Sequence, residues 1–326
     1  MASVIGLEIS SLCVRIAKVS ASKGGMEIEM LAEEPLQPGS VFGGEVREPQ
    51  SVTTAIRALW ARVGLKSKRV VLGVAGSGVA VRNTTIPWTP ANEIQDALAF
   101  QVGDVLPFDV EDAVLDFVVS AELTDANGDR QYRGMLVGAR LAFIESAVDA
   151  VQAAGLTVEA VDLISLAVLR AAAESPAMGP TPPVAVVNIC SNMTQVVVEV
   201  AGRPELVRGL SVGSDAAIAE YARLDPESPT AMSDALAPVL DEIVTTLEYF
   251  KASNPGKSLG RVVLCGEGSL LPGLDQALWT SMRIPVVREL SWLRIPRGQL
   301  GMPDQQVYAL APAMTAAVGL AAGALT

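Results

Sequence analysis

The chain has no histidine and only three cysteines. Without histidine, a histidine-based catalytic triad and a zinc site with histidine ligands are both excluded. The cysteines Cys13, Cys190 and Cys265 form no CxxC pair, which argues against a thiolate zinc site and favours reduced core thiols. No uninterrupted apolar run reaches the roughly 18 residues that span a bilayer. We therefore expect a globular protein that does not insert into a membrane itself.

Charged residues are few, and their balance is acidic. Asp and Glu outnumber Lys and Arg by 36 to 24, which gives a formal net charge of −12. Broad affinity for nucleic acid requires a basic face that neutralises phosphates, so the composition argues against such a partner. No charged and apolar leader precedes Val4, which already lies in a predicted strand, so a cytoplasmic protein is the default expectation.

A pattern of apolar strand, short polar break and apolar strand occurs twice, about 180 residues apart. Serine and asparagine at the breaks favour tight turns, so each stretch predicts a β-hairpin. The hairpins are expected over residues 4–19, with a turn at Ser10-Ser11, and over residues 184–200, with a turn at Cys190-Ser191-Asn192. The repeat predicts a protein made of two similar halves.

A third turn motif, Arg261–Leu274, combines a strand, a glycine turn and a helix start. Gly266 and Gly268 let the backbone approach a ligand closely, because glycine has no side chain to hold the ligand off. Two facing hairpins and a glycine turn, in this order, resemble the nucleotide site of the actin-like superfamily. Each turn alone is more often an ordinary surface turn, but their order, spacing and number favour the superfamily.

Between the two repeats, residues 79–162 predict strand, helix, strand, strand, helix and strand. Thr89-Pro90 has the chemistry of a helix start, and Asn127-Gly128 is a strong hairpin signal. A unit with this order can fold as a split βαββαβ subdomain. We predict an α/β, actin-like, two-lobed fold. Its expected parts are a first half over 1–78, an inserted subdomain over 79–162, a return helix and linker over 163–183, a second half over 184–304 and a C-terminal helix over 305–326. The C-terminal helix is expected to pack back on the first half.

Taken together, these segments resemble the PilM family of actin-like cytoplasmic proteins in type IV pilus assembly. VIGLEISSLCVRIAKV is similar to the family's opening hairpin, IPWTPANEIQDALAFQVGDVLPFDVEDAVLDFVV to its proline-led helix and the segment after it, LCGEGSLLPGL to its adenosine-side turn, and AMTAAVGLAAG to its last helix. The inserted segment is the most diagnostic, because actin and the sugar kinases have nothing like it.

The resemblance implies a site for ATP and magnesium on the turns, with Glu8 as the candidate catalytic residue and metal ligand. The candidate nucleotide-binding residues are Ser10, Ser11, Arg15, Asn188, Ser191, Asn192, Gly213, Glu242, Gly266 and Gly268. Several positions depart from the family pattern: Ser10 and Cys190 stand where glycine is usual, Asn188 where aspartate is usual, and Glu267 lies between the glycines of the third turn. Fewer carboxylates disfavour magnesium, and side chains obstruct phosphate, so we expect ATP and magnesium to bind weakly or not at all.

Two functions remain open at this point. One is a scaffold in which, as the resemblance implies, the inserted subdomain receives the cytoplasmic tail of the inner-membrane protein PilN. Such a scaffold would act with other pilus assembly proteins at the inner face of the cytoplasmic membrane. The other is a working actin-like ATPase or sugar-kinase relative, in which Glu8 and a water molecule handle hydrolysis. A related type II secretion adaptor usually continues into a membrane span, which the sequence up to Thr326 does not predict.

The expected contacts of the tail are large apolar residues beside prolines in predicted loops, since buried aromatic anchors dominate many peptide interfaces. They are Trp88, Leu106, Pro107 and Phe108. An equally weighted alternative is that Trp88 and Phe108 pin these loops to the helix between them.

Overall fold

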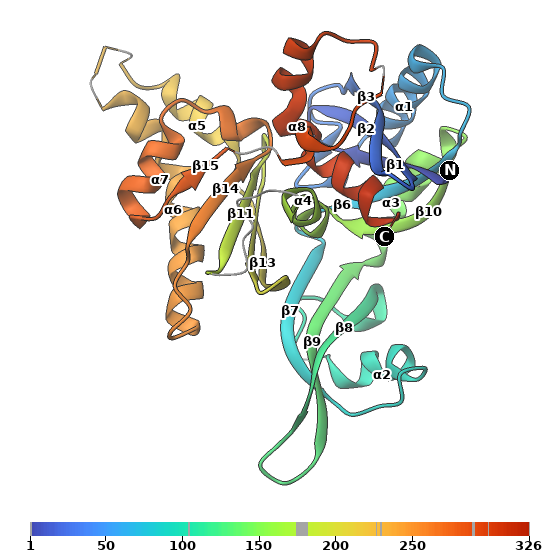
Figure 1. Ribbon diagram of the computed structural model, residues 1–326, viewed down its shortest axis with the longest axis vertical. Coiled ribbons are helices and arrows are strands. Elements are labelled where there is room, and N and C mark those ends of the chain that lie inside the picture. The colour runs from blue at the N-terminus through green and yellow to red at the C-terminus, as the bar shows by residue number, and fades with distance from the viewer. Residues whose placement is uncertain are drawn as a thin grey trace.

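The computed structural model describes residues 2–103, 105–173, 182–225, 227–228, 230–288, 291–298 and 300–325. It consists of two α/β lobes and a smaller body that projects away from them (Figure 1). The predicted linker within residues 163–183 lies largely outside the described residues, because 174–181 are not among them.

The first lobe is built on a five-stranded sheet in the order β10-β6-β1-β2-β3. Its strands are β1 (Ala2–Ile9), β2 (Cys13–Ser22), β3 (Gly25–Pro35), β6 (Arg69–Val74) and β10 (Thr157–Leu163). β1, β2 and β3 form an antiparallel meander, and β6 lies parallel to β1. Apolar faces of α1 (Pro49–Val63) and α3 (Leu141–Ala153) cover one side of the sheet, where Ile5 and Leu7 are buried. Alternation along β1 therefore sends these side chains into the first core.

The opposite side of this sheet is covered by α8 (Asp304–Gly323), with α4 (Ile164–Ala173) beside it. Glycine permits the close packing: a Cβ on Gly6 would lie 2.2 Å from the Ala317 carbonyl oxygen, and one on Gly319 would lie 1.9 Å from the Ala167 oxygen. Within the described chain, α8 is the one helix long and apolar enough to span a membrane by length and composition, and 61% of its most apolar window is buried in the protein. Its apolar surface is thus largely used for packing.

The second lobe repeats the first. Its sheet has the order β13-β12-β11-β14-β15, with β11 (Val184–Ile189), β12 (Thr194–Val200), β13 (Arg203–Leu210), β14 (Arg261–Cys265) and β15 (Val286–Val287). Three helices, α5 (Ser214–Tyr221), α6 (Ala231–Ser253) and α7 (Leu274–Met282), contribute to its core. The hairpins correspond at an offset of 180 residues: Glu8 pairs with Arg15 in the first and Asn188 with Gln195 in the second. The two predicted hairpins are therefore present in matching registers.

The projecting body holds a separate three-stranded sheet, in the order β7-β9-β8. Its strands are β7 (Val79–Pro87), β8 (Ala113–Thr124) and β9 (Arg130–Arg140), and α2 (Ile94–Gln101) packs on one face. A small core of Ile86, Leu98 and Leu136 joins helix and sheet. The remaining short elements are β4 (Val41–Phe42), β5 (Glu45–Val46) and the 3-10 helices Val110–Asp112, Glu267–Leu270 and Ser291–Arg294.

The predicted subdomain of residues 79–162 is wrong at its C-terminal end. α3 packs on α1 in the first core, and β10 pairs with β6 in the first sheet, so neither belongs to the projecting body. Phe143 and Val151 are apolar enough for either core, and periodicity does not show which core receives them. The helix expected after Thr89-Pro90 also begins later, at Ile94, because residues 90–93 form a separate turn in which the Glu93 amide donates to the Pro90 carbonyl.

Candidate functional site

The turns of the two hairpins meet between the lobes. Ser11 and Ser191, which occupy equivalent positions, are joined by a short hydrogen bond between their Oγ atoms. The two turns also share their local geometry: the Ser10 amide donates to the Cys13 carbonyl and the Cys190 amide to the Met193 carbonyl, each at 2.9 Å. The predicted facing turns are therefore present, and they contact each other directly.

A buried arginine links the first hairpin to the third turn. Arg15 on β2 is 3% exposed, and its Nη1 lies 3.8 Å from Glu8 Oε2 and 3.4 Å from Glu267 Oε2. Its Nε donates to Glu33 Oε2 on β3 at 3.2 Å. Because Glu267 belongs to the second lobe and also accepts a 3.2 Å hydrogen bond from the Ser191 amide, one guanidinium ties the lobes together.

Three carboxyl groups surround this single cation, and Glu8 is the most deeply buried of them. The pKa of Glu8 is raised to about 7: burial is the largest cause, Arg15 acts against it, and the charges of Glu267 and Glu33 add to it. Within the described chain, Glu8 Oε2, Arg15 Nη1 and Glu267 Oε2 make ion pairs but no well-aligned hydrogen bond. Buried polar atoms without such bonds are costly, so the cluster joins the lobes at an energetic cost.

In the second hairpin the equivalent pair is neutral. Asn188 is buried; its Nδ2 donates to Gln195 Oε1 and lies 3.5 Å from Cys190 Sγ. The amide that replaces a carboxylate is thus bound within its own hairpin. Gln195 Nε2, in contrast, has no hydrogen-bond partner among the described residues.

The glycines of the third turn pack against this hairpin. Gly266 has φ 78°, and a Cβ there would lie 2.3 Å from the Ile189 oxygen and 2.7 Å from Asn188 Oδ1. A Cβ on Gly268 would lie 2.4 Å from Ile189 Cγ2. The close approach that glycine permits is therefore used for contact between the third turn and the second hairpin.

Gly213 and the start of α5 complete the packing around the second turn. A Cβ on Gly213 would lie 2.3 Å from the Cys190 oxygen, and the Ser214 and Asp215 amides donate to the carbonyls of Cys190 and Ser191 at 2.9 and 2.8 Å. Asn192 is half-buried in the same turn. Glu242 is exposed on α6, and in the described chain no hydrogen bond or ion pair connects it to the turns.

These residues fit magnesium and polyphosphate poorly. The described part of the chain holds no group of three or more Cys, Asp or Glu side chains arranged for a metal ion. Glu8 is already paired with Arg15, and Glu267 places a carboxylate beside the turns, where it would repel phosphate. Glu33 and Gln195 were missed as candidates; their pairing with Arg15 and Asn188 across neighbouring strands is the signal that identifies them.

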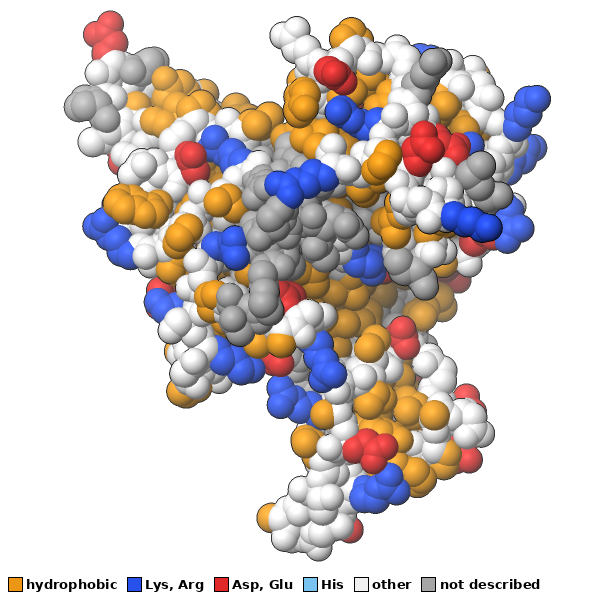
Figure 2. Space-filling model, viewed as in Figure 1, with side chains coloured by type: hydrophobic (Ala, Val, Ile, Leu, Met, Phe, Trp, Pro, Cys, Tyr) orange, Lys and Arg blue, Asp and Glu red, His pale blue; other side chains and the backbone are white. Residues whose placement is uncertain are grey.

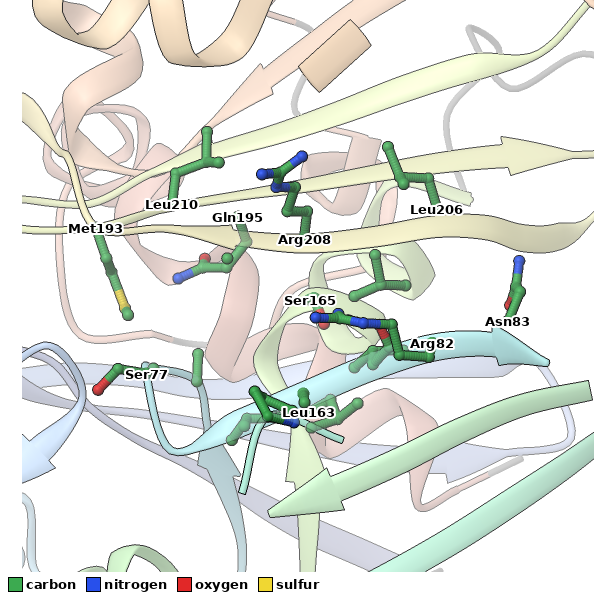
Figure 3. Close-up of a pocket in the computed structure, with 18 of the residues that line it drawn as sticks. Ser77, Arg82, Asn83, Leu163, Ser165, Met193, Gln195, Leu206, Arg208 and Leu210 are labelled. Carbon is green, nitrogen blue, oxygen red and sulfur yellow. The ribbon is translucent and has the colours of Figure 1, made fainter. Parts of the chain in front are cut away.

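A cleft of about 830 Å³ opens beside the turns, between the two lobes and the projecting sheet. It is lined by residues 79–83 of β7 and 205–210 of β13, together with the end of β6 and the C-terminal end of α6 (Figure 3). Gln195 and Met193 reach it, but Ser11 and Ser191 are not among its lining residues. This cleft is therefore distinct from the place where the turns meet.

A family model described as "Type IV pilus assembly protein PilM" matches residues 6–224. The chain belongs to the PilM family. The structure is also similar to that of a PilM-PilN type IV pilus biogenesis complex, with a TM-score of 0.84, 24% identity and coverage of 99% of this chain and 98% of that chain.

Two more distant structures share the fold of this PilM family member. The ethanolamine utilization protein EutJ from Carboxydothermus hydrogenoformans has a TM-score of 0.54 and 13% identity, covering 99% of this chain and 90% of that chain. A nucleotide-free diol dehydratase-reactivating factor has a TM-score of 0.56 and 10% identity, covering 98% and 99%. The predicted actin-like fold class is confirmed.

The four predicted tail-binding residues of this PilM family member do not form one patch. Trp88 is 39% exposed, lies 4.4 Å below the Arg130 guanidinium and is 6.4 Å from the ring of Tyr132. Leu106 and Phe108 instead pack over Gly138 on β9. Gly138 follows Tyr132 by six residues along this strand, which is roughly 20 Å at about 3.3 Å per residue. Pro107 is exposed and lines the interlobe cleft.

An exposed aromatic residue on α2 lies near the Trp88 end of the sheet. Phe100 is 92% exposed, and Gln101 beside it donates to Thr89 Oγ1 at 3.3 Å, which places this end of α2 next to β7. Its exposure follows from the helical period, because Phe100 is two residues after the buried Leu98 and so points to the opposite face. The sequence thus held a signal for this residue that the predicted set missed.

Proposed function

We propose that this PilM family member is a non-enzymatic scaffold of type IV pilus assembly, with a degenerate nucleotide cleft and a projecting sheet that binds the cytoplasmic tail of a PilN-like inner-membrane protein. The observation that carries the first part is the buried contact of Arg15 with Glu267 across the lobes. Binding of the tail recruits the scaffold to the inner face of the cytoplasmic membrane, where it meets other pilus assembly proteins.

Electrostatics and packing both support a degenerate cleft. The basic side chain nearest the turns, Arg15, is already neutralised by carboxylates, and the Ser11–Ser191 hydrogen bond occupies the space between the turns. A phosphate about 4 Å from the Glu267 carboxylate would meet a repulsion on the order of 4 kcal/mol at an effective dielectric constant of 20. Bound ATP would have to displace these contacts.

The exposed apolar residues of the projecting body support a peptide-binding surface. They are Trp88, Phe100, Val114, Val118, Val119 and Leu123. Val114 and Val118 alternate with the buried Leu115 and Phe117 and so lie on the sheet face away from α2, whereas Trp88 lies beside Tyr132 on the α2 side. Exposed apolar side chains that gather in one place mark interaction sites, which favours the α2 side with Trp88 and Phe100. A tail that contacts both the Trp88 end and the Leu106–Phe108 end must pass around α2, which covers the sheet between them. We assign Trp88 and Phe100 to its first anchor and Leu106, Pro107 and Phe108 to its second.

The test is fluorescence anisotropy with a labelled PilN-like tail peptide, combined with melting temperatures. Phe100→Ser and Trp88→Ala are expected to weaken binding about tenfold each, since aromatic anchors dominate such interfaces, with little change in melting. Ile218→Ser on α5, also an exposed apolar position at 58%, is the matched control. Equal affinity of all three variants and the wild type would place the tail elsewhere.

One observation favours a second candidate function, an actin-like ATPase or sugar-kinase relative. The pKa of Glu8, raised to about 7 by burial, suits a general base at neutral pH. Turnover of ATP by the wild type that is lost in Glu8→Gln, in a variant that remains folded, would favour this function over the scaffold.

A further inference from the structure

Two sheet edges face each other across the interlobe cleft. In the described chain, β7 pairs only with β9 and β13 only with β12, so each has one side without a strand partner. Asn83 Nδ2 donates to the Glu205 carbonyl at 2.6 Å and closes one end. From there the cleft extends to Ser77 and Gln195 (Figure 3). Free strand edges offer rows of backbone donors and acceptors to an added strand.

Side chains with hydrogen-bond donors line this cleft. Arg82 points along it toward Ser165, while Arg208 rises from β13 on the side away from β7 (Figure 3). Neither forms an ion pair with a carboxylate of the described chain, and Arg82 donates only to the carbonyl of its neighbour Val81. Gln195 is 2% exposed, and its Nε2 has no partner there. The exposed Arg82 and Arg208 and the buried Gln195 amide therefore offer donors to a ligand that supplies oxygen acceptors.

The cleft is cationic within an acidic protein. Its charged lining residues are Arg82, Arg133, Arg208 and Glu205, and Glu205 is already paired with Arg133 at 3.3 Å and with Lys257 at 3.7 Å. Figure 2 shows Lys and Arg side chains gathered where the second lobe meets the projecting sheet. Because the whole chain carries −12, this local excess of positive charge selects an anionic ligand.

We propose that the cleft binds an extended acidic segment of a partner protein, which pairs with a free strand edge and places its carboxylates on Arg82 and Arg208. Side chains of an added strand alternate between its two faces, so one row reaches Arg82 and the other reaches Arg208. Charge-assisted hydrogen bonds from the arginines supply the preference for carboxylates. The site excludes the first tail anchor, Trp88 and Phe100, and shares Pro107 with the second. Its test uses variants at Arg82 and Arg208, which belong to neither anchor.

The probe is a fluorescein-labelled octapeptide of glutamate and valine that has glutamates in both rows, titrated into the full chain. The wild type is expected to bind it, and the same peptide with glutamine in place of glutamate to bind about tenfold more weakly. Arg82→Ala and Arg208→Ala are each expected to weaken binding about fivefold. Arg223→Ala removes an exposed arginine that is not among the residues lining the cleft, and this control is expected to leave binding unchanged.

Two further measurements distinguish strand pairing from simple attraction of an anion. A probe N-methylated at alternate amides is expected to lose binding, because it cannot pair with a strand edge. Inorganic phosphate, at a concentration that leaves ionic strength unchanged, is expected not to displace the probe. Displacement by phosphate, undiminished binding of the methylated probe, or equal binding by the Arg82→Ala, Arg208→Ala and wild-type proteins would overturn the proposal.

Discussion

The two hairpins have the same backbone but opposite polar chemistry. At equivalent positions, the first carries the ions Glu8 and Arg15, whereas the second carries the neutral amides Asn188 and Gln195. The ionic pair reaches across to Glu267 in the other lobe, while the amide pair stays within its own hairpin. One repeat thus joins the lobes, and the other leaves a free N–H group for the neighbouring cleft.

This difference concerns the contacts that join the two lobes. Arg15 and the Ser11–Ser191 hydrogen bond connect the turns directly, and the degenerate cleft that we propose rests on these contacts. Because the ionic contacts of Arg15 are buried and partly lack aligned hydrogen bonds, they should be sensitive to charge and insensitive to nucleotide.

The largest expected effect comes from removing the cation. Arg15→Met leaves Glu8 buried without its cation and Glu267 with only the Ser191 amide, and is expected to cost about 3–5 kcal/mol of unfolding free energy. Gln195→Met, at the equivalent position, leaves only a neutral amide unsatisfied and should cost about 1–3 kcal/mol. Urea unfolding measures both values. Equal costs would remove the distinction between the hairpins, whereas partial recovery in Arg15→Met combined with Glu8→Gln would support it.

A pH effect should follow, and only from the first hairpin. The folded pKa of Glu8 lies above its ordinary value of 4.5, so its protonated form stabilises the folded state. This contribution is complete below about pH 4.5 and is lost as the pH rises through about 7. Its size is on the order of 3 kcal/mol. Glu8→Gln should reduce the fall in stability over this range, and Gln195→Met should keep it; identical pH profiles for Glu8→Gln and the wild type would contradict the buried charge.

A smaller effect is expected at the third turn. At Gly266 the backbone φ is positive, and an added Cβ would lie 2.3 Å from the Ile189 oxygen. Gly266→Ala should therefore lower the free energy of unfolding by about 2–3 kcal/mol. Gly64→Ala has a similar φ of 66° but nothing within 4 Å of its Cβ, so it should cost only about 1 kcal/mol. Denaturant titration of the pair isolates the packing contribution. If the costs are the same, the third turn is not pressed against the second hairpin.

The sequence predicted the features that depend on local pattern. Alternating apolar residues and turn chemistry located both hairpins and the glycine turn, and Asn127-Gly128 lies in the connection between β8 and β9. It did not predict that α3 and β10 return to the first lobe, because an apolar face does not specify the core that buries it. The separation of Trp88 from Phe108 was also hidden, since it depends on the path of the chain around α2. The contacts of Arg15 with Glu33 and Glu267 arise only when distant segments fold together.

The most direct test is the melting temperature of the wild-type protein with and without saturating magnesium-ATP. A ligand at 100 times its dissociation constant stabilises a folded protein by about 2.7 kcal/mol, which is readily visible as a shift. We predict no shift, because protein contacts already join the turns. A clear upward shift that is abolished by adding the metal chelator EDTA would show that the turns open to bind magnesium-ATP, and would contradict a closed, degenerate cleft.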